Sequence, residues 1–167
     1  MERGFTMLKA IAQRRSVRKF LAEPVDPHEV DELAAAFQAA PCGMHKTEVL
    51  RGVIVTDQQL RQEIEQVSNN ACYGAPLLFI LAVQKDSPFG ERDASVAAEN
   101  VMVQAAGLSL GSVYVMSGAM ALNKHPELLK KLGLPTDFQA AVIVPVGKPA
   151  EAPAAEDRIQ RYQLIRK

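Results

Sequence analysis

Hydrophobic residues recur along the chain with two different spacings, which predict helices alternating with strands. The clearest helix is expected to begin after Asp26, because Pro27 suits the first helical position and Glu29 completes a capping box. Its buried face follows at the i, i+3, i+4, i+7 spacing of a helix and consists of Val30, Leu33, Ala34 and Phe37. Pro41 ends this helical stretch.

Strands are predicted at residues 50–55, 77–83, 113–115 and 140–146. The stretch 77–83 is apolar throughout and short, as expected for a central strand that is buried on both faces. Because helices alternate with about four strands, the chain is expected to form an α/β or α+β layer structure. Its 167 residues fall within the usual size of a single domain.

Further helices are predicted over residues 7–14, 60–67, 93–110 and 126–132. The apolar side of the first is formed by Met7, Leu8 and Ile11. The Ala-rich helix 93–110 is apolar on nearly every side, so it belongs in the core or in an oligomer interface, and Gly111 is its expected C-cap. The chain ends in an extended arm, 149–167, whose tail is predicted to dock because of its apolar residues Ile159, Tyr162, Leu164 and Ile165.

Composition excludes several classes of function. The 19 basic residues balance the 19 acidic ones, so no charge excess is available for a broad nucleic-acid surface. Two cysteines and three scattered histidines fit neither a disulfide scaffold nor a metal centre, and they suit a protein of the reducing cytoplasm. No apolar run approaches the ~18 residues of a membrane span. The Arg-rich N-terminus contains Glu2 and leads directly into the fold pattern, which disfavours a transit peptide.

Arg14, Arg15 and Arg18 surround Ser16 and form the first candidate site. Guanidinium groups present planar sets of donors that match phosphate oxygens, and a serine hydroxyl adds another donor. Cations at a helix C-terminus, where they favour the macrodipole, are the alternative interpretation. The cluster alone leaves both open.

The segment Cys42-Gly43-Met44-His45-Lys46-Thr47 is the second candidate, either as a ligand-wrapping loop or as an ordinary connection between a helix and a strand. Cys42 has no identifiable His–acid pair, so catalytic thiol chemistry is not expected. The glycines at Gly107 and Gly111 follow a helix instead of preceding one, which disfavours a phosphate loop.

Taken in order, these segments resemble the nitroreductase family. Arg14-Arg15-Ser16-Val17-Arg18 resembles its Arg-x-Ser-x-Arg/Lys start, which binds the phosphate and ribityl chain of FMN. Residues 40–47 occupy the place of its Ala-Pro-Ser-x-x-Asn-x-Gln-Pro-Trp loop, which lies along the isoalloxazine and ribityl groups. Residues 115–118 fall where the family brings a backbone amide to flavin N5 and O4. Further matches are Gly74-Ala75-Pro76, the helix from Asp93 to Ser112, Gly133-Leu134-Pro135 and Val144-Pro145-Val146-Gly147.

The resemblance implies an α+β three-layer fold, with a central, mostly antiparallel sheet flanked by helices, in an interlaced homodimer. It implies an FMN-dependent oxidoreductase that passes hydride from NADH or NADPH through flavin N5 to a small nitro compound, quinone or similar acceptor. The partner's tail would bring Arg158, or alternatively Arg161, to the phosphate. The implied cofactor-binding residues are Arg14, Arg15, Ser16, Arg18, Cys42, Gly43, Met44, His45, Thr47, Met116, Ser117, Gly118 and Arg158.

The chain departs from the family pattern in the loop that follows Pro41. His45 stands where Asn is usual, Thr47 stands where Gln is usual, and Glu48-Val49 replaces Pro-Trp. These changes affect contacts to the flavin ring more than the phosphate site. A sensor or interaction dimer with little turnover, with or without flavin, is therefore the alternative function.

Overall fold

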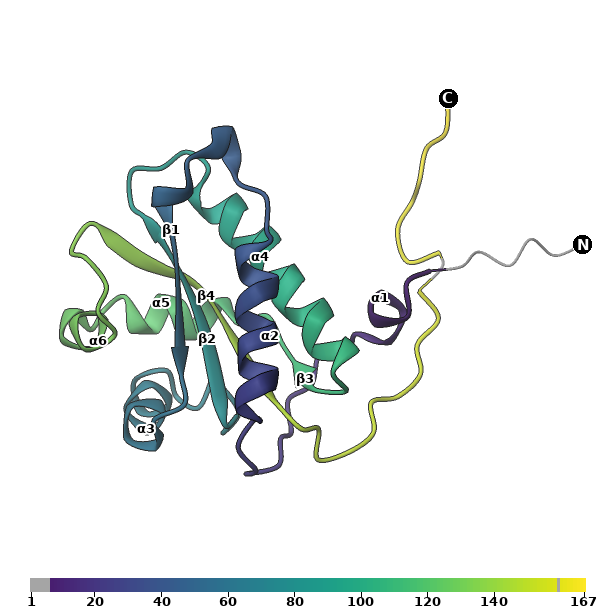
Figure 1. Ribbon diagram of the computed structural model, residues 1–167, viewed down its shortest axis with the longest axis horizontal. Helices are drawn as coiled ribbons and strands as arrows, with labels where there is room; N and C mark the ends of the chain where they lie inside the picture. The colour runs from purple at the N-terminus through teal and green to yellow at the C-terminus, as the bar shows by residue number, and fades with distance from the viewer. Residues whose placement is uncertain (1–6, 159) are drawn as a thin grey trace, which may run out of the picture.

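The computed structural model describes residues 7–158 and 160–167, so Glu2 and Ile159 lie outside the described residues. A four-stranded sheet lies between two layers of helices (Figure 1). The strands are β1 (Leu50–Val55), β2 (Leu77–Gln84), β3 (Gly111–Ser112) and β4 (Phe138–Gly147). Their order is β1-β2-β4-β3 and all neighbouring pairs are antiparallel, which confirms the predicted three-layer α+β architecture.

Helices cover both faces of the sheet (Figure 1). They are α1 (Lys9–Gln13), α2 (Pro27–Gln38), α3 (Gln58–Val67), α4 (Gly90–Gly107), α5 (Met116–Leu122) and α6 (Pro126–Lys131). One face packs against α2 and α4, and the other packs against α3, α5 and α6. As predicted, the Asp26 side chain accepts a hydrogen bond from His28 N at 2.8 Å, and the Glu29 carboxylate accepts one from Asp26 N at 3.2 Å.

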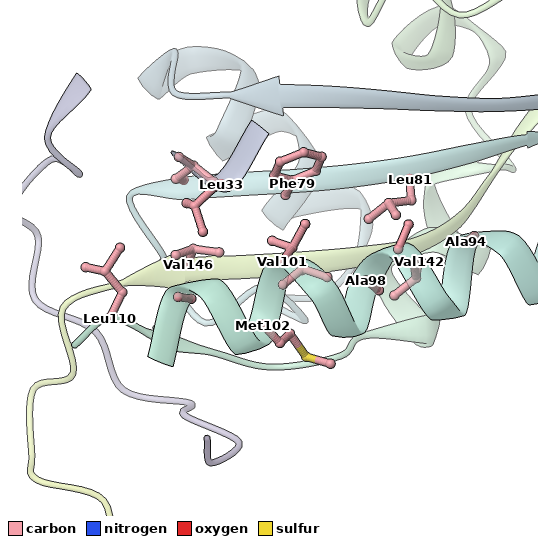
Figure 2. Close-up of a cluster of buried hydrophobic side chains, with 14 of the residues drawn as sticks. Leu33, Phe79, Leu81, Ala94, Ala98, Val101, Met102, Leu110, Val142 and Val146 are labelled. Carbon is pink, nitrogen blue, oxygen red and sulfur yellow. The ribbon is translucent and has the colours of Figure 1, made fainter. Parts of the chain in front are cut away.

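Strand β2 supplies both hydrophobic cores, because successive side chains of a strand point to opposite faces. Phe79 and Leu81 pack with Val101 of α4 on one side, as Figure 2 shows. Leu78 and Ile80 belong to the core on the other side. The prediction of a central strand buried on both faces is confirmed.

Helix α1 differs from its prediction in length and in the face it buries. It covers Lys9–Gln13, and the three residues predicted to be its apolar side, Met7, Leu8 and Ile11, are exposed. The helix contacts the end of α4 through Ala10, whose Cβ lies 3.7 Å from where a Cβ on Gly107 would stand. A short helix that rests on one neighbouring helix instead of on the sheet covers one small residue in part and leaves its large ones exposed.

The end of α4 was also predicted wrongly. The helix ends at Gly107, and Ser109 adopts a left-handed conformation with a φ of 61°. Leu110 N donates to Ala105 O at 2.8 Å and Ser109 N donates to Ala106 O at 3.1 Å, the hydrogen-bond pattern of a Schellman cap. Gly111 therefore does not cap the helix and instead begins β3.

The strand predicted at residues 113–115 is reduced to a single bridge between Val115 and Ile143, and helix α5 follows it directly. No helix was predicted over Met116–Leu122, because its seven residues are too few to display a helical period.

Candidate functional site

The arginine-rich segment leaves α1 and runs along the edge of the sheet. Arg14 is the C-cap of α1, and Val17 N donates a hydrogen bond to Ser112 O at 2.9 Å. Ser16 forms a parallel bridge with Ser112. Val17 is buried, whereas Ser16 and Arg18 are exposed. Alternate residues of an extended backbone face the same side, so Ser16 and Arg18 share the side that faces away from the core.

Gly111 allows this close approach of the segment to β3. A Cβ on Gly111 would lie 2.8 Å from Cβ, Cγ1 and Cγ2 of Val17, and Val17 is itself 7% exposed. The branched side chain of Val17 is stiff and surrounded, so it has little room to yield. The position of the Ser16–Arg18 backbone therefore depends on a glycine at 111.

We expect Gly111→Ala to destabilise the fold by roughly 1–3 kcal/mol, because it overpacks the contact with Val17. Thermal denaturation measures this change. Combining it with Val17→Ala should restore part of the loss, since the smaller side chain vacates the space that the new methyl group needs. A double variant whose destabilisation equals the sum of the two single effects would contradict this account of the contact.

A cavity of about 390 Å³ adjoins the arginine-rich segment. Arg14 and Arg15 line one side, and Ala106, Ser109 and Ser112 line another. The C-terminal arm closes it with Pro149 and residues 153–155. The arm reaches this position along its own chain, since Phe20 forms a bridge with Pro149 and Ala150 N donates to Lys19 O at 2.9 Å (Figure 1).

Arg14 and Arg15 line this cavity, and Arg158 lies next to it, against the lining residue Ala12. Arg15 Nε donates to Ala154 O at 3.2 Å and its Nη1 donates to Ala12 O at 2.8 Å, so Arg15 fastens the arm to α1. Arg158 Nη2 donates to Ala12 O at 2.6 Å. Burial, and then the positive charges of Arg15 and Arg14, lower the pKa of Arg158. The Glu156 carboxylate, 4.0 Å from Arg15 Nε, compensates part of this positive charge, and the remainder favours a further anion beside the arginines.

The tail therefore contacts its own chain at the point where it was predicted to reach a partner. Arg158 lies against the carbonyls at the end of α1, and Arg161 is paired with the Glu156 carboxylate. Arg14 Nε lies 3.5 Å from a carboxylate oxygen of Glu99, so part of its charge is already compensated.

The loop from Cys42 to Thr47 lies at the opposite end of α4. Gly43 N donates to Asp93 Oδ1 at 2.9 Å, and Asp93 belongs to the first turn of this helix. Asp93 and Ala106, which lines the cavity, are separated by 13 helical positions, or about 20 Å along the axis. Within one chain, this loop and the arginine-rich segment are therefore far apart.

The third predicted segment lies close to the first. Val115 follows Ser112 by three residues, and α5 begins at Met116. Met116 and Ser117 are exposed, whereas Gly118 is buried against Ile143. The fold thus joins residues 14–18 to residues 115–118 through β3.

Sequence reasoning missed two residues that shape the site. Asp93 is predicted only as a helix start, and the sequence does not distinguish this buried acid from Glu91 and Glu99 of the same helix, which are exposed. Gly111 was interpreted as a helix cap, and nothing local to the sequence indicates its contact with Val17.

Cys42 is partly exposed and Cys72 is buried. Both are unpaired, and burial raises the pKa of the Cys72 thiol to about 12, so it stays protonated and unreactive. Across residues 7–158 and 160–167, no group of three or more His, Cys, Asp or Glu side chains could hold a metal ion. In the same ranges, no helix has the length and apolar content needed to cross a membrane.

Comparisons with a family model, with known sequences and with solved structures all find similarity to nitroreductases and related flavin oxidoreductases. The model of the nitroreductase family matches residues 11–72. A Methanothermobacter thermautotrophicus protein assigned as an NADH dehydrogenase/NAD(P)H nitroreductase is 27% identical over 161 residues, covering 90% of this chain and 81% of its own length. The NADPH-flavin oxidoreductase of Vibrio harveyi is 24% identical, covering 95% of this chain and 72% of its own.

Solved structures share the fold. A Desulfitobacterium hafniense nitroreductase with bound FMN superimposes with a TM-score of 0.86 at 19% identity, over 95% of this chain and 97% of its own. A Bacteroides fragilis nitroreductase with bound FMN gives a TM-score of 0.82 at 21% identity, over 94% and 97% of the two chains. Motif order, the family model over residues 11–72 and the fold agree, and the chain is similar to proteins of the nitroreductase family.

Proposed function

We propose that this protein is an FMN-dependent oxidoreductase that takes electrons from NADH or NADPH and passes them to a small organic acceptor, such as a nitro compound or a quinone. The observation that carries the proposal is the arginine-rich segment, which β3 holds extended beside a cavity that Arg14 and Arg15 line, with Arg158 next to them on Ala12 O. Its relatives include a flavin oxidoreductase and FMN-bound nitroreductases, which supports the same reaction class.

The residues present fit FMN. Its phosphate is a dianion, and Arg14, Ser16 and Arg18 offer charged and hydroxyl donors from alternate positions of one extended segment. Arg15 donates its N–H groups to backbone carbonyls, so we assign it to holding the arm. Arg158 adds positive charge beside it. FMN, when bound, supplies the hydride chemistry.

The rest of the chain orients the flavin and excludes water from it. The backbone amide of Gly118, on the segment joined to Ser16 through β3, is our candidate donor to the flavin ring. The loop residues Cys42, Gly43, Met44, His45 and Thr47 are candidates for lining the ring face. Met44 is 73% exposed and so is free to contact a ligand.

A homodimer completes this proposed site. The loop and the arginine-rich segment are about 20 Å apart along α4, so a second copy is needed to bring one to the other. Large apolar side chains on the described surface are available for such an interface, namely Met7, Leu8, Ile11, Met116, Met120, Tyr162, Leu164 and Ile165. With two unpaired cysteines, we place the dimer in a reducing cytoplasm.

The purified protein is expected to be yellow, to release FMN on denaturation, and to be bleached by NADH or NADPH under anaerobic conditions. Absorption spectra before and after addition of each nucleotide measure this. Colourless protein that cannot be reconstituted with FMN would overturn the proposal. Bound FMN with negligible turnover of nitro and quinone acceptors would instead favour the sensor or interaction dimer.

A further inference from the structure

Asp93 is a buried acid, and the only hydrogen bond of its side chain within the described residues is to the loop. Its side chain is in the first turn of α4 and the residue is 6% exposed. Oδ1 accepts the bond from Gly43 N at 2.9 Å, while the buried Oδ2 has no hydrogen-bond partner within residues 7–158 and 160–167. Burying a carboxylate with an unsatisfied oxygen is costly, although the N-terminus of an 18-residue helix partly offsets its charge. Such a residue calls for a specific role.

The loop that Asp93 holds is conformationally strained. Met44 and His45 are consecutive non-glycine residues with φ values of 53° and 56°. Residues in this left-handed region are uncommon and persist where their surroundings hold them in place. The start of α4 provides this hold twice, because Phe89 also packs so closely that a Cβ on Gly43 would lie 2.6 Å from its Cγ.

Both contacts fix the backbone before Met44 and leave the side chains beyond it exposed. Met44, His45 and Thr47 are all exposed, so the anchoring does not serve to bury the loop itself. A loop held rigidly while its side chains face outward is preorganised for a ligand, since less freedom is lost on binding.

We propose that Asp93 is the positioning residue for the flavin-facing loop, and that it acts through the Gly43 N–H without touching the reacting atoms. This inference rests on the proposed function. It assigns Asp93 to binding of the isoalloxazine and ribityl groups, whereas Arg14 and Arg18 are assigned to the phosphate. The two ends of the flavin can therefore be tested separately with FMN and with riboflavin, which lacks the phosphate.

Asp93→Ala is expected to weaken the binding of FMN and of riboflavin by the same factor, about tenfold to a hundredfold, since it removes a charge-assisted hydrogen bond that orders the loop. Asp93→Asn keeps an acceptor for Gly43 N and should restore most of the affinity. Fluorescence titration of the full-length dimer measures both flavins, and hydrogen exchange of the Gly43 amide should accelerate at least about tenfold in Asp93→Ala.

Three further variants separate a loop effect from a general one. Glu91→Ala removes the other acid from the first turn of α4, where it is exposed, and should change neither affinity. Arg18→Ala should weaken FMN alone. Gly43→Ala displaces the loop by its clash with Phe89 while Asp93 stays intact, so it should match Asp93→Ala even if that variant fails to fold.

If the wild-type protein binds FMN and flavin affinity is unchanged in both Asp93→Ala and Gly43→Ala, the role of Asp93 is overturned and the proposed function stands. Loss of FMN affinity with riboflavin affinity intact would also overturn it, because the effect would then lie at the phosphate. Wild-type protein that binds neither flavin would overturn the proposed function and this role with it.

Discussion

Replacing Arg14 and Arg18 together by alanine is expected to weaken FMN binding by about a hundredfold or more. Each charged donor to a phosphate contributes roughly 1.5–3 kcal/mol, and about 1.4 kcal/mol corresponds to a factor of ten. Arg14 already lies 3.5 Å from a carboxylate oxygen of Glu99, which places its share at the lower end. Riboflavin, which has no phosphate, should bind the double variant as well as it binds wild type.

Lys19→Ala is the matched control for this experiment. Lys19 adjoins Arg18 in the same exposed segment, but its Nζ is 2.8 Å from Glu151 on the arm, a pairing that raises the pKa of Lys19. Its removal should leave FMN affinity within about twofold, as expected for an exposed ion pair. Equal losses in Lys19→Ala and the double variant would mean that general positive charge, and not the spacing of Arg14 and Arg18, attracts the phosphate.

Phe79→Ala should lower the free energy of unfolding by about 3–5 kcal/mol, the largest effect expected of a single substitution here. Phe79 is 1% exposed on β2, where Figure 2 shows it in the core. Its ring centroid lies 5.4 Å from that of Phe37 in α2. Truncation would leave a cavity between the sheet and the α2–α4 layer that neither can collapse to fill.

Urea denaturation measures this loss, with Phe79→Leu as the control that keeps most of the volume and should cost less than about 1.5 kcal/mol. A loss below about 1 kcal/mol in Phe79→Ala would show that this core repacks readily. Phe79 does not line the cavity beside the arginine-rich segment, so the variant protein that remains folded should still bind FMN more tightly than riboflavin.

Local patterns predicted the elements whose cause is local. The capping box of α2 depends on Asp26 and Glu29, three residues apart, and β2 is recognisable because each of its residues from Leu77 to Val83 is apolar. The exposed side of α1 could not be predicted, because the only described helix it contacts closely is α4, nearly a hundred residues away. Distant partners decide which face of a short helix is buried.

In the site, too, features with a local cause were predicted and features that depend on distant residues were not. The sequence placed donors at Arg14, Ser16 and Arg18, but which of them face a ligand depends on the pairing with Ser112. The role of Arg15 depends on the arm, because its Nε donates to the carbonyl of Ala154, 139 positions away. The separation of Gly43 from the cavity follows from the length of α4, and this is why one chain leaves the proposed flavin site incomplete.

The contact between Gly111 and Val17 also constrains how this chain can change over evolution. Because a Cβ at 111 would stand 2.8 Å from the valine side chain, neither position can drift alone. Homologues with a larger residue at 111 should carry a smaller one at 17, and the pair should covary although 94 positions separate them. Such a correlation would record selection on the placement of the backbone between Ser16 and Arg18.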